Sequence, residues 1–250
     1  MKIIALANQK GGVAKTTSTY NLACAKALDG YRVLMVDLDP QASLTISCGI
    51  EPGEQEFCTS NLFDGKSDPV DCVYSVRHSK LENLYIIPSD IDLAETETFL
   101  FARANRERQL KKALNKLSEY FDYAFIDCPP QLGLLLTNAL VAAHEVIVPV
   151  KTDYLSYRGL RALLSTIENI QSDEDLNGNL KLLGIIPTMY EKNVRDQRDV
   201  LALLEDKANV LGVIKKAADT YRSVIDGIPV VLSNKHCDVS KAYIKIAKSI

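Results

Sequence analysis

The feature that most constrains the fold is the stretch from residue 2 to residue 17, where an apolar run gives way to a glycine turn and then to a helical pattern. The apolar run at residues 3–7 predicts a strand buried on both faces. After Lys15, apolar residues recur at three- and four-residue spacing until Gly30 provides a stop. A strand, a glycine turn and a helix N-terminus predict an anion site, because unpaired backbone N–H groups and the helix dipole converge there.

The residues of this turn favour nucleotide binding. Lys15 can place a positive charge against the outer phosphates, and the Thr16 hydroxyl can reach a magnesium ion. The spacing is not that of the common loop G-x-x-x-x-G-K-[ST], whose two glycines would fall on Gln9 and Ala14. The alternative is a glycine turn with two solvated lysines. The order of strand, glycines, lysines, threonines and helix makes nucleotide binding the better interpretation.

The loop resembles the deviant Walker A motif of the ParA/MinD ATPases, usually K-G-G-x-G-K-[ST]. The resemblance implies ATP as the ligand, and it implies that Lys10 reaches across a dimer interface to the partner subunit's nucleotide. Ala14 stands where the family more often has glycine. If that position needs a positive φ, alanine there carries a strain cost. The loop residues implied to bind ATP are Lys10, Gly11, Gly12, Val13, Ala14, Lys15, Thr16 and Thr17.

A second apolar strand, at residues 32–36, runs directly into Asp37 and Asp39. A strand-helix-strand unit of this length forms a right-handed parallel crossover, which brings both aspartates to the carboxyl edge of the sheet beside the loop. The phrase Asp-x-Asp-Pro-Gln is similar to the family's second nucleotide motif. The resemblance assigns Asp39, together with Lys10 and Lys15, to catalysis and Asp37 to magnesium. A solvated strand end is the alternative for either aspartate.

A third carboxylate follows the apolar strand at residues 121–126. Apolar residues that run into an aspartate, here Asp127, form a Walker B pattern, which places a carboxylate near a metal ion, often through water. The continuation D-x-P-P and residues 133–140 resemble the family's switch II region and its following helix. Three carboxylates on neighbouring strand ends are hard to explain as packing. We therefore expect Thr16, Asp37 and Asp127 to organise Mg²⁺.

The remaining pattern predicts the fold class. Strands and helices alternate, so we expect an α/β protein with a single doubly wound, mostly parallel sheet and helices on both faces, of the P-loop NTPase type. No repeat, linker or low-complexity tract interrupts the chain, which predicts one domain over residues 1–250 without an N-terminal DNA-binding extension. Further strands are expected at 84–88, 145–150, 182–186 and 210–214, helices at 43–47, 59–63, 99–120, 154–170, 194–204 and 240–250, and a helix cap at 89–90.

The C-terminal half supplies candidates for base and DNA contacts. Pro187-Thr-Met189-Tyr matches a phrase common among plasmid ParA proteins, and Lys215 stands in a loop that contacts adenine in the family. The resemblance therefore implicates Met189 and Lys215 in nucleotide binding. Lys215, Lys216 and Arg222 are the candidates for DNA, since Arg222 lies near family positions implicated in DNA binding. The alternative surface is the basic segment from Arg103 to Lys116, although most charged helix faces are simply solvated.

Composition limits these interpretations. The formal charge is −3 and the pI about 5.7, so any DNA binding must come from a local patch. The six cysteines form no C-x-x-C pair, which fits a reducing cytosol. We see no signal peptide and no uncharged stretch that approaches the length of a membrane span. The expected location is the cytoplasm, in association with the nucleoid.

The resemblance extends over essentially the whole chain and implies a short, Soj-like member of the ParA family, the ATPase of a plasmid or chromosome partition system. Such a protein binds Mg-ATP, closes into a homodimer, holds DNA without sequence preference, and is released by slow hydrolysis that a ParB-like centromere-binding protein stimulates. The first alternative is a MinD-like membrane-cycling ATPase, although no stable membrane association is expected here. A metabolic or metal-cluster carrier of the same superfamily is the second, and the missing C-x-x-C argues against it.

Overall fold

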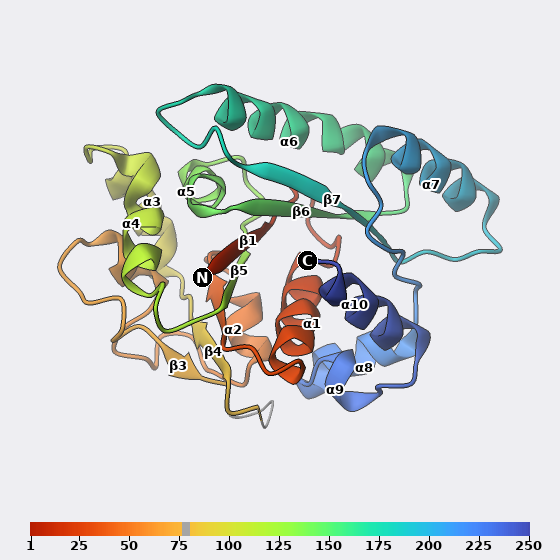
Figure 1. Ribbon diagram of the computed structural model, residues 1–250, viewed down its shortest axis with the longest axis horizontal. Helices are drawn as coiled ribbons and strands as arrows, with labels where there is room; N and C mark the ends of the chain where they lie inside the picture. Colours follow the sequence, from red (N-terminus) through yellow and green to blue (C-terminus); the bar gives the residue numbers. More distant parts are fainter. Residues whose placement is uncertain (77–80) are drawn as a thin grey trace.

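The computed structural model describes residues 1–76 and 81–250. Within these ranges the chain forms one seven-stranded sheet in the order β3-β4-β2-β5-β1-β6-β7 (Figure 1). All the neighbouring strands pair in parallel except β3, which runs antiparallel at the edge. The strands are β1 Lys2–Leu6, β2 Val33–Asp37, β3 Tyr74–Ser75, β4 Leu84–Ile87, β5 Tyr123–Asp127, β6 Glu145–Lys151 and β7 Lys181–Thr188.

Helices cover both faces of this sheet, so the predicted doubly wound α/β fold is confirmed (Figure 1). The helices are α1 Lys15–Leu28, α2 Ser43–Ser47, α3 Asp92–Leu100, α4 Gln109–Lys116, α5 Leu134–Ala142, α6 Tyr154–Ser172, α7 Arg195–Lys207, α8 Ala218–Asp226, α9 Val230–Ser233 and α10 Asp238–Lys248, with 3₁₀ turns η1 Thr59–Phe63 and η3 Arg106–Arg108.

The central strand explains why both faces need cover. In β1, Ile3 and Ala5 point into a core that includes residues of α5 and α6, whereas Ile4 and Leu6 point into a second core that includes residues of α1 and α10. Successive side chains of a strand point to opposite faces, so a continuous apolar run buries its strand on both sides. The predicted two-faced burial of this strand is therefore confirmed.

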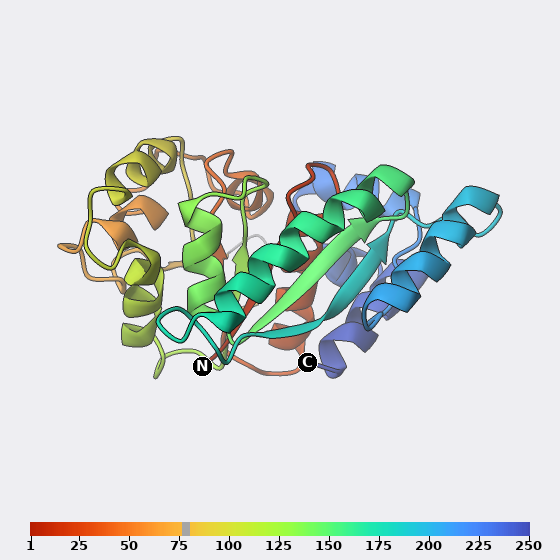
Figure 2. The same ribbon diagram turned by 90° about the horizontal axis from the view of Figure 1, so that it is seen from above.

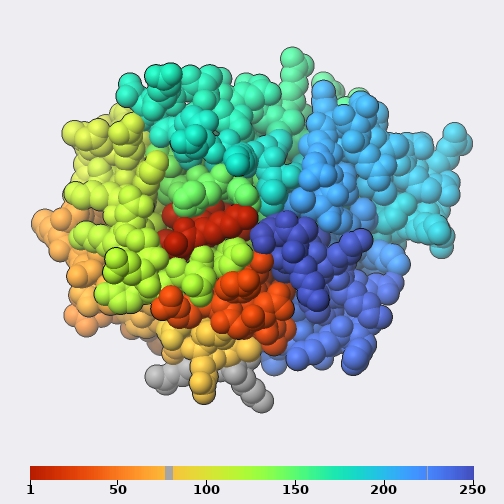
Figure 3. Space-filling model, viewed as in Figure 1, coloured from red at the N-terminus to blue at the C-terminus, as the bar shows by residue number. Residues whose placement is uncertain are grey.

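The loop after β1 lies at the edge of the sheet where the parallel strands end. In Figure 2 this loop, in dark red, lies far from both chain ends, which share the opposite edge. Figure 3 shows that opposite edge, with the first residues of β1 in red at the surface beside the end of α10 in dark blue. The candidate residues of the loop and of the strand ends thus gather on one side of the molecule, as expected for open α/β sheets.

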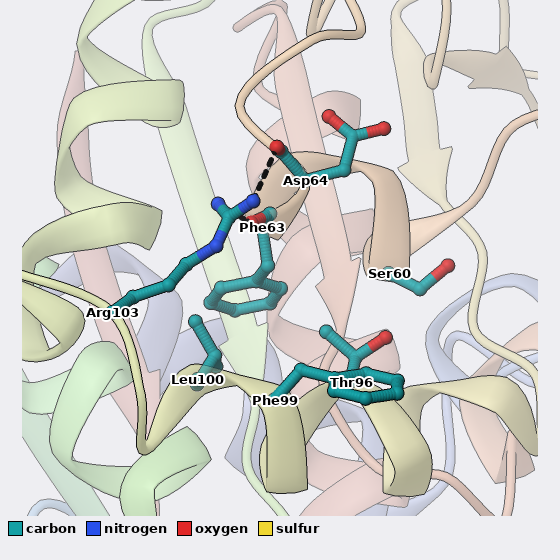
Figure 4. Close-up of a pocket in the computed structure, with 7 residues that line it drawn as sticks. All are labelled: Ser60, Phe63, Asp64, Thr96, Phe99, Leu100 and Arg103. Carbon is teal, nitrogen blue, oxygen red and sulfur yellow. Dashed lines mark hydrogen bonds between the residues drawn. The ribbon is translucent and has the colours of Figure 1, made fainter.

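The predicted continuous helix over residues 99–120 is wrong. The chain leaves α3 after Leu100 and re-enters a helix only through η3 and α4, with Asn105 between them at a φ of 52°. The Arg103 guanidinium donates hydrogen bonds to the backbone carbonyls of Phe63 and Asp64 at the end of η1 (Figure 4). These bonds, beside a cavity of about 210 Å³, hold the turn against η1, so the basic residues do not share one helix face.

Two other local predictions need correction. Residues 210–214 form no strand, because they pair with β7 only through one isolated bridge, between Ile185 and Val210. Pro187 lacks the N–H that a continuous ladder would require there. The expected cap at residues 89–90 is found only in part: Asp90 Oδ1 accepts a bond of 3.1 Å from the N–H of Asp92, but the helix begins after Ile91.

The last helix belongs to the core. Tyr243 and Ile246 of α10 are buried, and the Tyr243 hydroxyl lies 3.0 Å from Ser18 Oγ of α1. A helix packed in this way is needed by the fold. Among residues 1–76 and 81–250, we find no helix with the length and apolar character that crossing a membrane requires. None of the six cysteines in these ranges forms a disulfide.

Candidate nucleotide site

The loop between β1 and α1 has the backbone shape of an anion site. Asn8 fixes its start, because its side chain donates to Pro149 O at 2.7 Å and accepts from Lys10 N at 3.0 Å. Gly12 and Ala14 both adopt positive φ values, of 69° and 67°. Ala14 therefore occupies the left-handed region that the sequence argument considered, which strains a non-glycine residue. The helix starts immediately afterwards, at Lys15, so its first N–H groups face the loop.

Behind the loop, a threonine and an aspartate predicted for the same ion are in direct contact. Thr16 Oγ1 donates to Asp127 Oδ2 at 2.6 Å, and Thr19 Oγ1 lies 3.2 Å from Asp127 Oδ1. Asp127 is 1% exposed and Lys15 is 8% exposed, so these charged groups are almost entirely out of water. The structure thus brings Lys15, Thr16 and Asp127 together, although the first two begin α1 and the third ends β5.

Asp37 lies beside this cluster. It is fully buried at the end of β2 and stands opposite Asp127 in the parallel register of β2 and β5. Its Oδ2 accepts from the N–H and the hydroxyl of Thr45, at 2.9 and 2.7 Å, and its Oδ1 accepts from Asp39 N at 3.2 Å. The carboxylate therefore anchors the turn that carries Asp39. Thr45 was not predicted, because nothing in its local sequence distinguishes it.

Both buried carboxyls resist ionisation. Burial raises the pKa of Asp37, and the hydrogen bonds from Thr45 oppose that shift only in part. Burial also raises the pKa of Asp127, and the neighbouring Asp37 charge adds to it, against the bond from Thr16 and the charge of Lys15. Two carboxylates this close repel each other, and a divalent cation nearby would favour their charged forms.

These side chains fit magnesium. Carboxylate and hydroxyl oxygens are the donors it prefers, and it commonly takes only one or two protein carboxylates, with phosphate and water completing its shell. No group of three or more His, Cys, Asp and Glu side chains that could hold a metal ion occurs among the described residues. The set formed by Thr16 and Asp127, with Asp37 behind it, therefore suits an ion that arrives together with a phosphate ligand.

Asp39 differs from the other two aspartates because it is only half-buried. Its Oδ1 accepts from Gln41 N at 3.0 Å, and Ala42 closes the turn at a φ of 52°. The turn borders a cleft of about 430 Å³ that also includes Ile91. A carboxylate held by backbone bonds at the edge of a site can orient a water molecule, whereas a buried one cannot reach solvent.

Lys10 points away from the buried cluster. Its Nζ donates to Asp153 Oδ1 and to Ser156 Oγ, both at 2.9 Å. Asp153 also caps α6 by accepting from Ser156 N at 2.8 Å. Burial by itself would raise the pKa of Asp153, but the bonds from Lys10 and Ser156 outweigh it and hold that pKa well below its usual range. Sequence reasoning missed both partners, although D-x-x-S before an apolar helix is a capping signal.

The surface beside Lys10 is apolar. Tyr154 and Leu155, the first two residues of α6, are 58% and 71% exposed. Large exposed apolar side chains that flank a charged group commonly mark a contact surface. Lys10 and this surface come from elements far apart in the sequence, so their association is a product of the fold.

The base-side candidates lie at the end of β7. Thr188 Oγ1 donates to Val13 O at 3.1 Å, which joins this strand end to the loop after β1. Met189 follows at a φ of 55°. The backbones of Tyr190 and Lys215 form a parallel bridge, so the two predicted nucleotide-binding segments, at Met189 and Lys215, are neighbours.

The candidate DNA-binding residues are exposed, but two of them are paired. Lys215 Nζ lies 2.8 Å from Asp238 Oδ2, and Lys216 Nζ lies 3.0 Å from Glu191 Oε1. Arg222 is exposed on α8, next to Tyr221, which is 79% exposed. Ion pairs of this kind are weak at a surface, so the lysines can exchange a carboxylate for another anion.

Comparison with known proteins gives extensive matches. A family profile described as an AAA domain matches residues 1–182. The sporulation initiation inhibitor protein Soj of Bacillus subtilis is 36% identical and covers 100% of this chain and 98% of its own. The chromosome partitioning protein ParA of Caulobacter vibrioides is 34% identical, over 100% and 94%. The structure of cobyrinic acid a,c-diamide synthase from Mycobacterium smegmatis, with bound ATP analog and magnesium, matches with a TM-score of 0.83 and 37% identity, over 99% and 93%.

Proposed function

The chain belongs to the Soj/ParA family of chromosome-partitioning ATPases, and from that premise we propose that it is an ATP-driven dimerisation switch that binds DNA without sequence preference. The observation that supports this most directly is the pair of lysines in one loop. Lys15 is almost buried and its charge opposes the rise that burial causes in the pKa of Asp127, whereas Lys10 is held by Asp153 and Ser156.

In this proposal, each subunit binds Mg-ATP at the loop after β1. Loop amides from Gly11 to Thr17 surround the phosphates, and Lys15 neutralises the outer ones. Thr16 and Asp127 hold Mg²⁺, and Asp37 supports them from behind. The metal ion supplies neutralisation of the charge on the phosphate oxygens. Met189 and Lys215 contact the base, at the segment that Thr188 joins to Val13.

Asp39 is proposed to position the water that attacks the terminal phosphate. It fits this role because its carboxylate is accessible, while bonds to Gln41 N and from its own N–H to Asp37 fix its turn. Phosphoryl transfer depends chiefly on positioning and charge neutralisation. A single subunit with Lys10 turned away has an incomplete set of positive charges, so in this proposal it hydrolyses ATP slowly.

Dimer formation is proposed to move Lys10 from Asp153 to the nucleotide of the partner subunit. The exposed Tyr154 and Leu155 beside it provide apolar surface for a second copy of the chain. A face-to-face arrangement is isologous, so each subunit supplies its Lys10 to the partner's nucleotide and its own nucleotide receives the partner's lysine. The dimer aligns basic residues, with Lys215, Lys216 and Arg222 as candidates, along one DNA duplex.

A ParB-like partner is proposed to stimulate hydrolysis and so release the dimer from DNA. This cycle places the protein in the cytoplasm, on the nucleoid. The membrane-cycling alternative gains no support from α10, because its apolar residues pack against α1 and are not available to lipid. We therefore advance a single function.

The test is the size of the Asp39→Ala variant by light scattering with ATP, with ADP and without nucleotide. We expect a dimer with ATP alone, and we expect Lys10→Ala to bind ATP yet remain monomeric. Co-sedimentation with DNA and with liposomes, each with and without ATP, then separates the partition and membrane functions. An ATP-loaded Asp39→Ala sample that stays monomeric would reject the dimerisation switch.

A further inference from the structure

The loop that follows β7 is held in a strained shape by its neighbours. Thr188 is fully buried, and its hydroxyl bonds to Val13 O. Met189 adopts a φ of 55°, in the left-handed region. Tyr190 N donates to Ile214 O at 3.1 Å on the other side. A non-glycine residue keeps such a conformation only where surrounding contacts enforce it.

One of these contacts comes from α7. Gln197 is half-buried, whereas all the remaining residues from 192 to 199 are exposed. Its Oε1 accepts from Glu191 N at 2.6 Å and lies 3.1 Å from Thr152 Oγ1. Glu191 offers a backbone N–H, which requires an acceptor, so the amide oxygen of Gln197 must face the loop.

Thr152 extends the contact to the other end of the same loop. It is 1% exposed, and its backbone N–H donates to Thr188 O at 3.1 Å. Its hydroxyl lies between Gln197 Oε1 and Thr188 O, at 3.1 and 3.2 Å, and can donate to either. Gln197 therefore holds Glu191 directly and Thr188 through Thr152, so that both ends of the strained segment are fixed by one side chain.

We propose that Gln197 is a positioning residue for nucleotide binding, which fixes residues 188–191 in the shape that receives the base. The inference rests on the function proposed above, in which Met189 contacts the base. Without the Gln197 acceptor, the Glu191 N–H loses its partner, and the left-handed turn loses one of the contacts that enforce it. Nucleotide then binds only to the fraction of molecules that retain the shape, and its apparent affinity falls by that fraction.

This role separates base binding from phosphate binding. Gln197 bonds directly to Glu191 and Thr152, and this network reaches the loop after β1 only through Thr188, at the backbone oxygen of Val13, which is not one of the N–H groups that face phosphate. The affinity for ATP and ADP should therefore depend on Gln197, whereas the affinity for inorganic tripolyphosphate should not. A merely structural residue would change the two affinities together.

The experiment measures binding of Mg-ATP, Mg-ADP and Mg-tripolyphosphate by calorimetry. Gln197→Met keeps the length and helix preference of the side chain but removes the acceptor, and Gln197→Glu restores an acceptor. Gln171→Met is the matched control, because it removes a 2.7 Å bond to Leu180 O beside the other end of β7. We expect Gln197→Met to weaken ATP and ADP binding roughly tenfold and to leave tripolyphosphate unchanged.

We expect Gln197→Glu to retain most of the ATP affinity and Gln171→Met to retain all of it. If Gln197→Met does not fold, Thr152→Val replaces it as the test. This variant removes the hydroxyl of the same network and should also weaken ATP binding. Unchanged ATP affinity in Gln197→Met, or an equal loss for ATP and tripolyphosphate, overturns the inference. If the wild type binds tripolyphosphate as tightly as ATP, the base adds no affinity; this result overturns the inference about Gln197 but remains consistent with the proposed phosphate site. A wild type that binds neither refutes the proposed function itself.

Discussion

The two ends of the nucleotide site have opposite electrostatics. At the inner end, formed by Lys15, Thr16, Asp37 and Asp127, burial raises the pKa of both carboxyls. At the outer end, formed by Lys10, Asp153 and Ser156, hydrogen bonds hold the pKa of the carboxyl well below its usual range despite burial. The inner end has two buried carboxyls and only Lys15 to balance them, so it favours a further cation, whereas the single carboxyl of the outer end is already paired with Lys10. We expect ligand binding to supply a cation to the inner end, and the proposed dimer formation to break the ion pair of the outer end.

The largest expected difference between the two ends is in their lysines. Lys15→Ala should weaken ATP binding by at least roughly 100-fold, because a nearly buried charge is removed from the phosphates. Lys10→Ala should change the affinity of a single subunit by less than roughly threefold, since Lys10 is bonded to Asp153 there. Titration calorimetry at a protein concentration that keeps both variants monomeric measures the contrast. Equal losses in the two variants would contradict the division into inner and outer ends.

The next contrast is in the dependence of stability on pH. The inner carboxyls have raised pKa values in the folded state, so above about pH 4, where they ionise in the unfolded chain, the unfolded state is increasingly favoured. In metal-free, nucleotide-free protein, the free energy of unfolding should therefore fall as the pH rises from about 4 towards neutrality. Asp153, with its lowered pKa, contributes stability above its unfolded pKa and loses it as the pH falls.

Urea unfolding between pH 4 and pH 8 measures this dependence. Asp127→Asn should flatten the decline towards neutral pH, because the asparagine has no charge to desolvate, and Mg-ATP should flatten it in the wild type. Asp122→Asn is the control, since Asp122 forms an exposed pair with Arg32 at the opposite edge of the sheet. If the free energy of unfolding of the wild type instead rises steadily across this range, the pKa values of the inner carboxyls are not raised by burial.

A smaller effect is expected when the outer end is loosened. Asp153→Asn keeps an oxygen that can cap α6 but removes the charge that holds Lys10. ATP-dependent dimerisation should then become roughly threefold to fivefold tighter, since a half-exposed ion pair contributes roughly 0.3 to 0.5 kcal/mol and the dimer breaks two of them. Sedimentation equilibrium with Asp39→Ala as the background measures the dimer constant. A weaker dimer would show that Asp153 stabilises the interface, and that its ion pair with Lys10 does not compete with dimer formation.

The sequence predicted the inner end better than the outer end, for a physical reason. Lys15 and Thr16 begin the helix that follows the loop after β1, and Asp127 ends β5. Because β1 and β5 are parallel neighbours, the sheet brings these positions to the same edge. The bond from Lys10 to Asp153 joins residues 143 positions apart, and no local pattern specifies such a partner.

The same reasoning explains the errors elsewhere. The periodicity of residues 99–120 favoured one helix, but it could not include the bonds from Arg103 to the end of η1, which are tertiary. Gln197 was hidden for the opposite reason: it is an ordinary polar residue on a polar helix face, and only its partners distinguish it. Residues at strand ends were predictable, and residues that act through distant backbone groups were not.

The smallest expected effect concerns the strain at Ala14. Ala14→Gly removes the Cβ that disfavours its φ of 67°, although glycine also gives the unfolded chain more freedom. We expect a net gain below about 1 kcal/mol, or roughly 2 to 4 °C in Tm. Ala42→Gly is the matched control, because Ala42 has a φ of 52° outside the loop. Both variants should gain stability, but Ala14→Gly alone should alter ATP affinity. A destabilised Ala14→Gly would mean that the alanine keeps the inner end in its binding shape by restricting the loop, and that its strain is outweighed.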